Sequence, residues 1–113
     1  MIQQDQPGQF PQSFTVALSS KSDGTMLDRS LTTHDTSAVD NRAKFCQQAG
    51  LDYGYVVYQA IVYGDDQTYD KIVTVDRSHT TAHLPDVNAD ALFTKTPDVG
   101  LFLPVADCVA TVI

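Results

Sequence analysis

The chain has 113 residues and a formal net charge of −7, and every one of its fourteen acidic residues is Asp. A chain of this length forms one domain at most, and an acidic surface with seven scattered basic residues repels nucleic-acid phosphates. There are two cysteines, no signal-peptide pattern and no apolar run of membrane-spanning length, which predicts a soluble, cytoplasmic protein without a nucleic-acid or membrane partner.

The first third of the chain is mostly polar. Residues 1–12 are rich in Gln and Pro, which predicts a flexible tail and leaves residues 13–113 as the folded portion. The run Phe-Thr-Val-Ala-Leu at 14–18 predicts a short strand. A polar segment follows, with a turn signal at Asp23-Gly24.

The strongest helix signal covers residues 38–49. Ser37 stands where an N-cap residue belongs, with Asp40 three residues later, and Gly50 is the expected stop at the other end. Three small or apolar side chains recur at helical spacing and predict the buried stripe, namely Val39, Ala43 and Cys46.

The second half of the chain reads as strands and loops. Residues 55–63 and 71–76 are rich in β-branched side chains, and the turn between them predicts a hairpin. Residues 77–88 form a polar loop, whereas 89–94 fit either a short helical turn or a strand.

The most apolar runs, 101–105 and 109–113, are typical of central strands that are buried on both faces. Together with the helix, these strands predict an α+β fold.

Asp107 and Cys108 lie between these two apolar runs, so an acid and a thiol stand together in a buried setting. Such a placement is unfavourable unless the polar groups are satisfied or used. The simpler interpretation is a small buried Cys beside an Asp that caps a turn.

The longer segment 89–108, ADALFTKTPDVGLFLPVADC, resembles the pattern ADAL-T--PG--L-----ADC of the laccase-domain family, the bacterial polyphenol oxidases.

This resemblance implies a layered sandwich of mixed sheets with helices outside, of which residues 13–113 would be the N-terminal portion. It also implies phosphorolysis of adenosine or inosine, with adenosine deamination as a related activity. The cofactor would be zinc, copper being less favoured. The partners would be a purine nucleoside, phosphate, and the missing C-terminal half or a second copy of the chain.

Individual site residues follow from the same resemblance. Cys108 would be a metal ligand and Asp107 a catalytic neighbour. Tyr63 or Tyr69 stands where the family has a metal-binding His, and Tyr69 is expected to bind substrate. Lys21 lies near the place of the family's Arg loop, and Asn41 matches the Asn of its Asn-Arg pair, so both are expected to bind substrate.

Other interpretations stay open. The family's second His lies downstream of the Ala-Asp-Cys motif, and this chain ends five residues after Cys108, which predicts a fragment that is inactive alone and holds no cofactor. A non-catalytic relative that acts in binding or assembly is the alternative. His79 and His83 could join Cys108 in a different metal set, although a mobile loop is the default for them. A plain α+β domain with a buried Cys needs no family at all.

Overall fold

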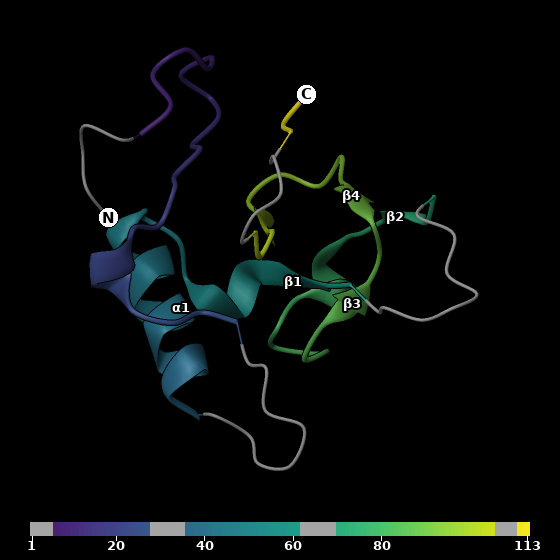
Figure 1. Cartoon of the computed structure of the whole chain (residues 1–113). Helices are drawn as coiled ribbons and strands as arrows, with labels where there is room; N and C mark the ends of the chain where they lie inside the picture. Colours follow the sequence, from purple (N-terminus) through teal and green to yellow (C-terminus); the bar gives the residue numbers. More distant parts are fainter. Residues whose placement is uncertain (1–5, 28–35, 62–69, 106–110) are drawn as a thin grey trace. The chain divides into compact units, whose positions relative to one another are not determined.

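The computed structural model describes residues 6–27, 36–61, 70–105 and 111–113 (Figure 1). The chain divides into two compact units, Met1–Asp52 and Tyr53–Ile113. The first unit contains the 3-10 turn η2 (Lys21–Asp23) and helix α1 (Thr36–Gln48). The second contains the short turns and strands η3 (Tyr53–Tyr55), β1 (Val56–Ala60), β2 (Ile72–Thr74), η4 (Arg77–His79), β3 (Val87–Asn88), β4 (Ala91–Phe93) and β5 (Gly100–Phe102). The predicted α+β class is confirmed.

Helix α1 confirms the predicted helix but begins one residue before the proposed cap. Ser37 is the second helical residue and therefore not the N-cap. The buried side chains, Ala38, Arg42, Phe45 and Cys46, form one stripe, whereas Val39 of the predicted stripe is exposed. Sequence spacing identified the helix, but the predicted buried positions 39 and 43 are each one residue after the observed ones, 38 and 42. The prediction missed Arg42 because a charged side chain is not expected in a buried stripe.

The helix ends as the sequence predicts. Gly50 adopts a φ of 83°, its N–H donates to the Gln47 carbonyl, and the Leu51 N–H donates to the Cys46 carbonyl at 2.8 Å. These two bonds form a Schellman motif, which satisfies carbonyl groups that the helix leaves without partners.

The predicted strand at 14–18 is absent, because these described residues contain no strand. Phe14 is 67% exposed, and the backbone of Leu18 bonds to a side chain instead of a neighbouring strand. Gln6 Nε2 donates to the Leu18 carbonyl at 2.8 Å, and the Leu18 N–H donates to Gln6 Oε1. The apolar run therefore belongs to a loop that the Gln6 side chain closes at Leu18.

In the second unit, β1 is the central strand of a three-stranded sheet with the order β3-β1-β5. Both neighbours run parallel to it, with Val57 opposite Leu101 and Gln59 opposite Val87. The first four residues of β1 are all buried, which is the pattern of a parallel strand covered on both faces. Thus β1, and not the 101–105 segment, is the central strand of the described sheet.

The predicted hairpin between 55–63 and 71–76 is wrong. Strand β2 pairs with β4 in a second parallel sheet, with Val73 opposite Leu92, and does not pair with β1. The segment 89–94 is accordingly a strand. A turn signal between two β-rich runs favours local pairing, but here burial against non-local strands decides the partners.

The core of the second unit joins its two sheets. Val57, Val75 and Val87 form the buried cluster. Four partly buried side chains from both sheets and the turn before β5 pack against it, namely Val73, Leu92, Val99 and Leu101. On the opposite face of β1, the rings of Tyr58 and Phe102 pack with centroids 5.5 Å apart. Tyr58 and Phe102 lie opposite each other in the β1–β5 pairing, so this contact joins neighbouring strands along one face of the sheet.

Candidate functional site

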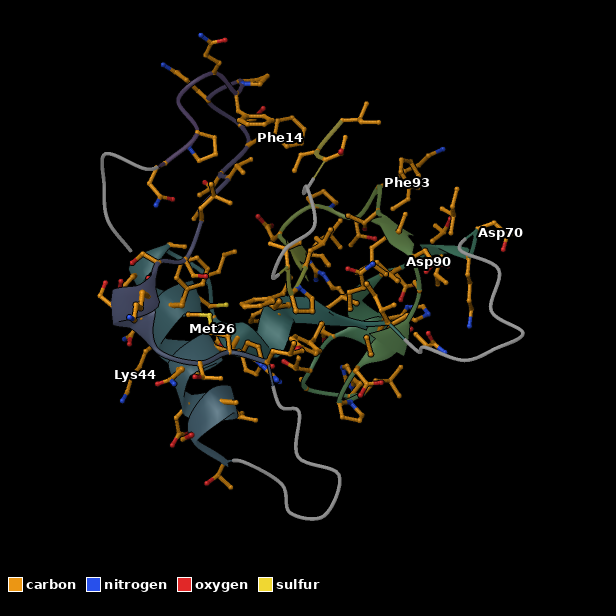
Figure 2. The ribbon with its side chains drawn as sticks, viewed as in Figure 1. Phe14, Met26, Lys44, Asp70, Asp90 and Phe93 are labelled. Carbon is orange, nitrogen blue, oxygen red and sulfur yellow. The ribbon has the colours of Figure 1, made fainter. Side chains whose placement is uncertain are left out.

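In the first unit, a loop is fastened onto helix α1 by two consecutive side chains. Asn41 Nδ2 donates to the Thr25 carbonyl at 2.9 Å, and Arg42 Nε donates to the Met26 carbonyl. Met26 lies beside α1 in Figure 2. The Asn-Arg pair singled out in the sequence thus has a defined structural role, since each member holds one backbone carbonyl of the same loop.

The start of this loop is closed by its own polar groups. The Ser20 N–H donates to Asp23 Oδ2 at 2.7 Å, and the Ser20 hydroxyl donates to the same oxygen at 3.1 Å. Gly24 follows with a φ of 83°, a conformation that an L side chain rarely adopts. The loop therefore has a defined shape over Ser20–Met26.

Lys21 and Asn41 belong to this loop-and-helix assembly, but they are not equally available to a ligand. Lys21 is exposed on η2, so its ammonium can meet an anion from solvent. Asn41 already uses one N–H of Nδ2 for the Thr25 carbonyl, so a direct contact with substrate would use Oδ1 or the second N–H of Nδ2. The predicted pair therefore consists of one exposed cation and one residue that positions the loop.

The residues expected around the metal lie outside the described part of the chain. This holds for Asp107 and Cys108 and for the two candidate tyrosines, Tyr63 and Tyr69. Cys46, the other thiol, is buried on α1, and burial raises its pKa to about 11. A thiol with that pKa stays protonated at neutral pH, which makes Cys46 a packing residue.

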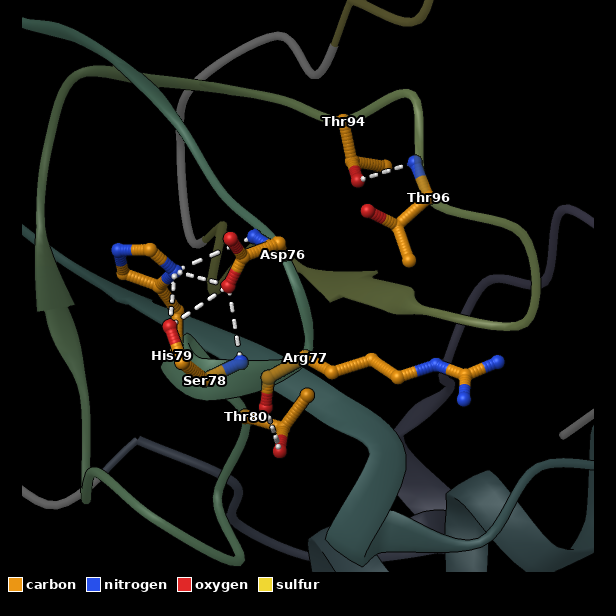
Figure 3. A network of polar contacts seen from close by, with 7 residues as sticks. All are labelled: Asp76, Arg77, Ser78, His79, Thr80, Thr94 and Thr96. Carbon is orange, nitrogen blue, oxygen red and sulfur yellow. Dashed lines mark hydrogen bonds and ion pairs between the residues drawn. The ribbon is translucent and has the colours of Figure 1, made fainter.

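The second unit holds a polar network that the sequence analysis did not assemble (Figure 3). Asp76 Oδ1 accepts from the Ser78 N–H at 2.9 Å, from the Ser78 hydroxyl at 2.6 Å and lies 3.0 Å from His79 Nδ1. These bonds lower the pKa of the Asp76 carboxyl, the Ser78 hydroxyl contributing most. An Asp followed three residues later by a polar acceptor is the capping-box pattern, and this signal was present in the sequence.

This network orders one of the two histidines that the sequence placed in a mobile loop. His79 is held in the turn η4, whereas the side chain of His83 is exposed. Within the ranges described above, no three His, Cys, Asp or Glu side chains gather into a group that could hold a metal ion. The described residues alone thus do not fit a copper or zinc centre, and the proposed ligand Cys108 is not among them.

Residues 17–113 match the family described as multi-copper polyphenol oxidoreductase laccase. The chain belongs to this family. No curated protein and no solved structure matches it. The laccase-domain resemblance of the 89–108 segment is therefore confirmed and extends over most of the chain.

One backbone detail lies within the 89–108 segment, where Asp98 follows Pro97 in the turn before β5. Asp98 adopts a φ of 61°, the left-handed conformation that Gly accepts most readily. The turn therefore has a backbone shape that suits Gly, although Asp occupies the position.

Among the residues that the structure describes, none of the helices has the length and apolar character that a membrane span needs.

Proposed function

We propose that this protein acts in purine nucleoside phosphorolysis, as the N-terminal portion of a laccase-family enzyme. The observation that carries the proposal is the family match over residues 17–113, which includes the Ala-Asp-Cys motif. In this proposal, Cys108 is a metal ligand and Asp107 a proton-exchanging neighbour. The family description names copper, and zinc is the metal proposed here.

A zinc ion with two imidazoles and one thiolate would keep a fourth position open and supply a Lewis acid. The residues of this chain would contribute binding and orientation around it. Lys21 supplies an exposed positive charge for phosphate, which it would attract as a point charge and not through a bidentate fork. Asn41 and Arg42 hold the loop that carries Lys21, and so fix where that charge sits.

The test uses the product of the complete open reading frame, purified with zinc and supplied with inosine or adenosine and phosphate. We expect phosphate-dependent release of the free base, and loss of that release in Cys108→Ala. Cys46→Ala is the matched control, because Cys46 is buried and protonated, and this variant should keep its activity. Base release that survives Cys108→Ala would contradict the assignment of the ligand.

The alternative is a non-catalytic relative that retains binding or assembly. Tyr in place of a metal-binding His favours this alternative, since a phenol is a poor zinc ligand beside imidazole and thiolate. Calorimetric titration with inosine and phosphate, combined with an assay for the free base, distinguishes the enzyme from the non-catalytic relative. Binding without base release in the zinc-loaded protein supports the alternative, and turnover excludes it.

A further inference from the structure

One nitrogen atom, His79 Nδ1, has two partners that require opposite roles from it. The backbone N–H of Asp76 points at Nδ1 from 3.1 Å, so this bond needs a lone pair on the nitrogen. Oxygen Oδ1 of the Asp76 carboxylate lies 3.0 Å from the same nitrogen, and this contact needs a proton on it. A ring nitrogen has either a lone pair or a proton, so the two bonds exclude each other at any instant.

The protonation state of the ring decides which bond forms. In the neutral ring with its proton on Nε2, Nδ1 accepts from the Asp76 amide and completes a capping box with His in the place usually taken by Glu or Gln. In the imidazolium both nitrogens carry protons, so Nδ1 must donate, and the carboxylate is the acceptor within reach.

The surroundings of His79 are simple enough to isolate this effect. In the described part of the chain, the hydrogen bonds of its ring are made with Asp76 and Ser78. The Ser78 hydroxyl lies 3.3 Å from Nδ1 and donates to Asp76 Oδ1. Arg77, the neighbouring cation, extends away from the ring in Figure 3.

We propose that His79 is a pH-responsive switch of the η4 N-cap: the neutral ring accepts from the Asp76 backbone amide, and the protonated ring releases that amide and binds the Asp76 carboxylate. The turn stays capped in both states, because the Ser78 N–H donates to Asp76 Oδ1 independently of the ring. What changes is the Asp76 N–H, which loses its acceptor on acidification.

The turn η4 lies between segments that are hydrogen-bonded to the two sheets. Immediately before Asp76, the Val75 N–H donates to the Phe93 carbonyl at 2.8 Å, next to the β2–β4 sheet. Two residues after the end of η4, the Thr81 N–H donates to the Val56 carbonyl at 2.8 Å, at the start of β1. The switch therefore lies in the connection between the two sheets, and acidification frees a backbone group there.

The experiment measures amide hydrogen exchange by NMR on the full 113-residue chain, from about pH 5 to pH 8, the range in which His titrates. The readout is the exchange rate of the Asp76 amide divided by that of the Ser78 amide, which cancels most of the intrinsic pH dependence. We expect this ratio to rise about three- to tenfold on acidification, as the loss of one hydrogen bond predicts. Its midpoint should coincide with that of the His79 ring signals.

Two variants with the same substitution complete the test. His79→Gln keeps an acceptor at this position at every pH, so its ratio should stay low and constant. His83→Gln replaces an exposed histidine of the same loop and should retain the full pH dependence. A constant ratio in the unmodified chain, or the same pH dependence in His79→Gln, would overturn the proposal.

Discussion

The side chain of Asn41 closes over Gly24 so tightly that a Cβ placed on Gly24 would lie 2.6 Å from Asn41 Nδ2. That nitrogen is already committed to the Thr25 carbonyl at 2.9 Å. The loop that carries Lys21 therefore packs against the Asn41 side chain and is also hydrogen-bonded to it. Any side chain at position 24 would collide with the amide group that makes this hydrogen bond.

We expect Gly24→Ala to lower the free energy of unfolding by about 1–3 kcal/mol, because it adds strain at positive φ and displaces a hydrogen-bonded amide. Urea denaturation measures the change.

Two other glycines serve as controls. Gly50 has the same φ of 83° but open space around its Cβ position, so Gly50→Ala should cost about 1 kcal/mol for the positive φ without the contact. Gly24 combines that φ with a ψ of 179°, a region essentially restricted to Gly, so part of its larger expected effect is backbone strain. Gly8→Ala has neither feature and should change stability by less than about 0.5 kcal/mol. Equal effects at Gly24 and Gly50 would show that the contact with Asn41 is unimportant.

The turn before β5 offers a stabilising substitution. Because Asp98 adopts a φ of 61°, Asp98→Gly should raise the free energy of unfolding by about 0.5–1 kcal/mol, and Asp98→Ala should lower it. Asp86 provides the matched control, since it also follows a Pro but has no positive φ. Thermal denaturation measures the stability of both Asp→Gly variants. If Asp86→Gly also stabilised the protein, the positive φ of Asp98 would not explain the effect.

The buried side chain of Gln59 is expected to stabilise the strand junction beside β1. Its Nε2 donates to the Ala89 carbonyl at 2.9 Å, and both residues are buried. Gln59→Met keeps the volume and removes the donor, so we expect a loss of about 1–3 kcal/mol in unfolding free energy. Gln47→Met, at an exposed position of α1, should be nearly neutral in the same urea titration. A neutral Gln59→Met variant would show that the carbonyl finds another donor.

The thiol of Cys46 should react slowly with iodoacetamide at pH 8, because burial raises its pKa to about 11 and leaves little thiolate. In denaturant the rate should rise sharply. Peptide mass spectrometry separates Cys46 from Cys108, and equally fast labelling of Cys46 in the folded protein would contradict its burial.

The same shift sets the sign of a pH effect on stability. The folded state holds the Cys46 proton more tightly than the unfolded state, whose pKa is near the ordinary value of 9.0. The stabilising contribution is therefore complete below about pH 9 and is lost as the pH rises towards 11. Cys46→Ala should remove this part of the alkaline destabilisation.

The sequence alone determined the features that depend on neighbouring residues. The helix at α1, its end at Gly50 and the strand segments at β1, β2 and β5 were predicted from local spacing and composition. Strand β3 lies in the segment predicted to be a polar loop, and for β4 the sequence left a helical turn open as well. Local propensity suffices there because helix hydrogen bonds and the Schellman motif join residues three to five positions apart. The laccase-family motif at 89–108 was equally readable, since it is a contiguous pattern.

Only the tertiary structure decided the partners. The pairing of β1 with β3 and β5, the loss of the expected hairpin, and the attachment of the 20–26 loop to Asn41 and Arg42 all join segments that are distant in the sequence. The physical reason is that parallel strands and side-chain-to-carbonyl bonds are chosen by which surfaces can be buried together, and no local pattern encodes that choice.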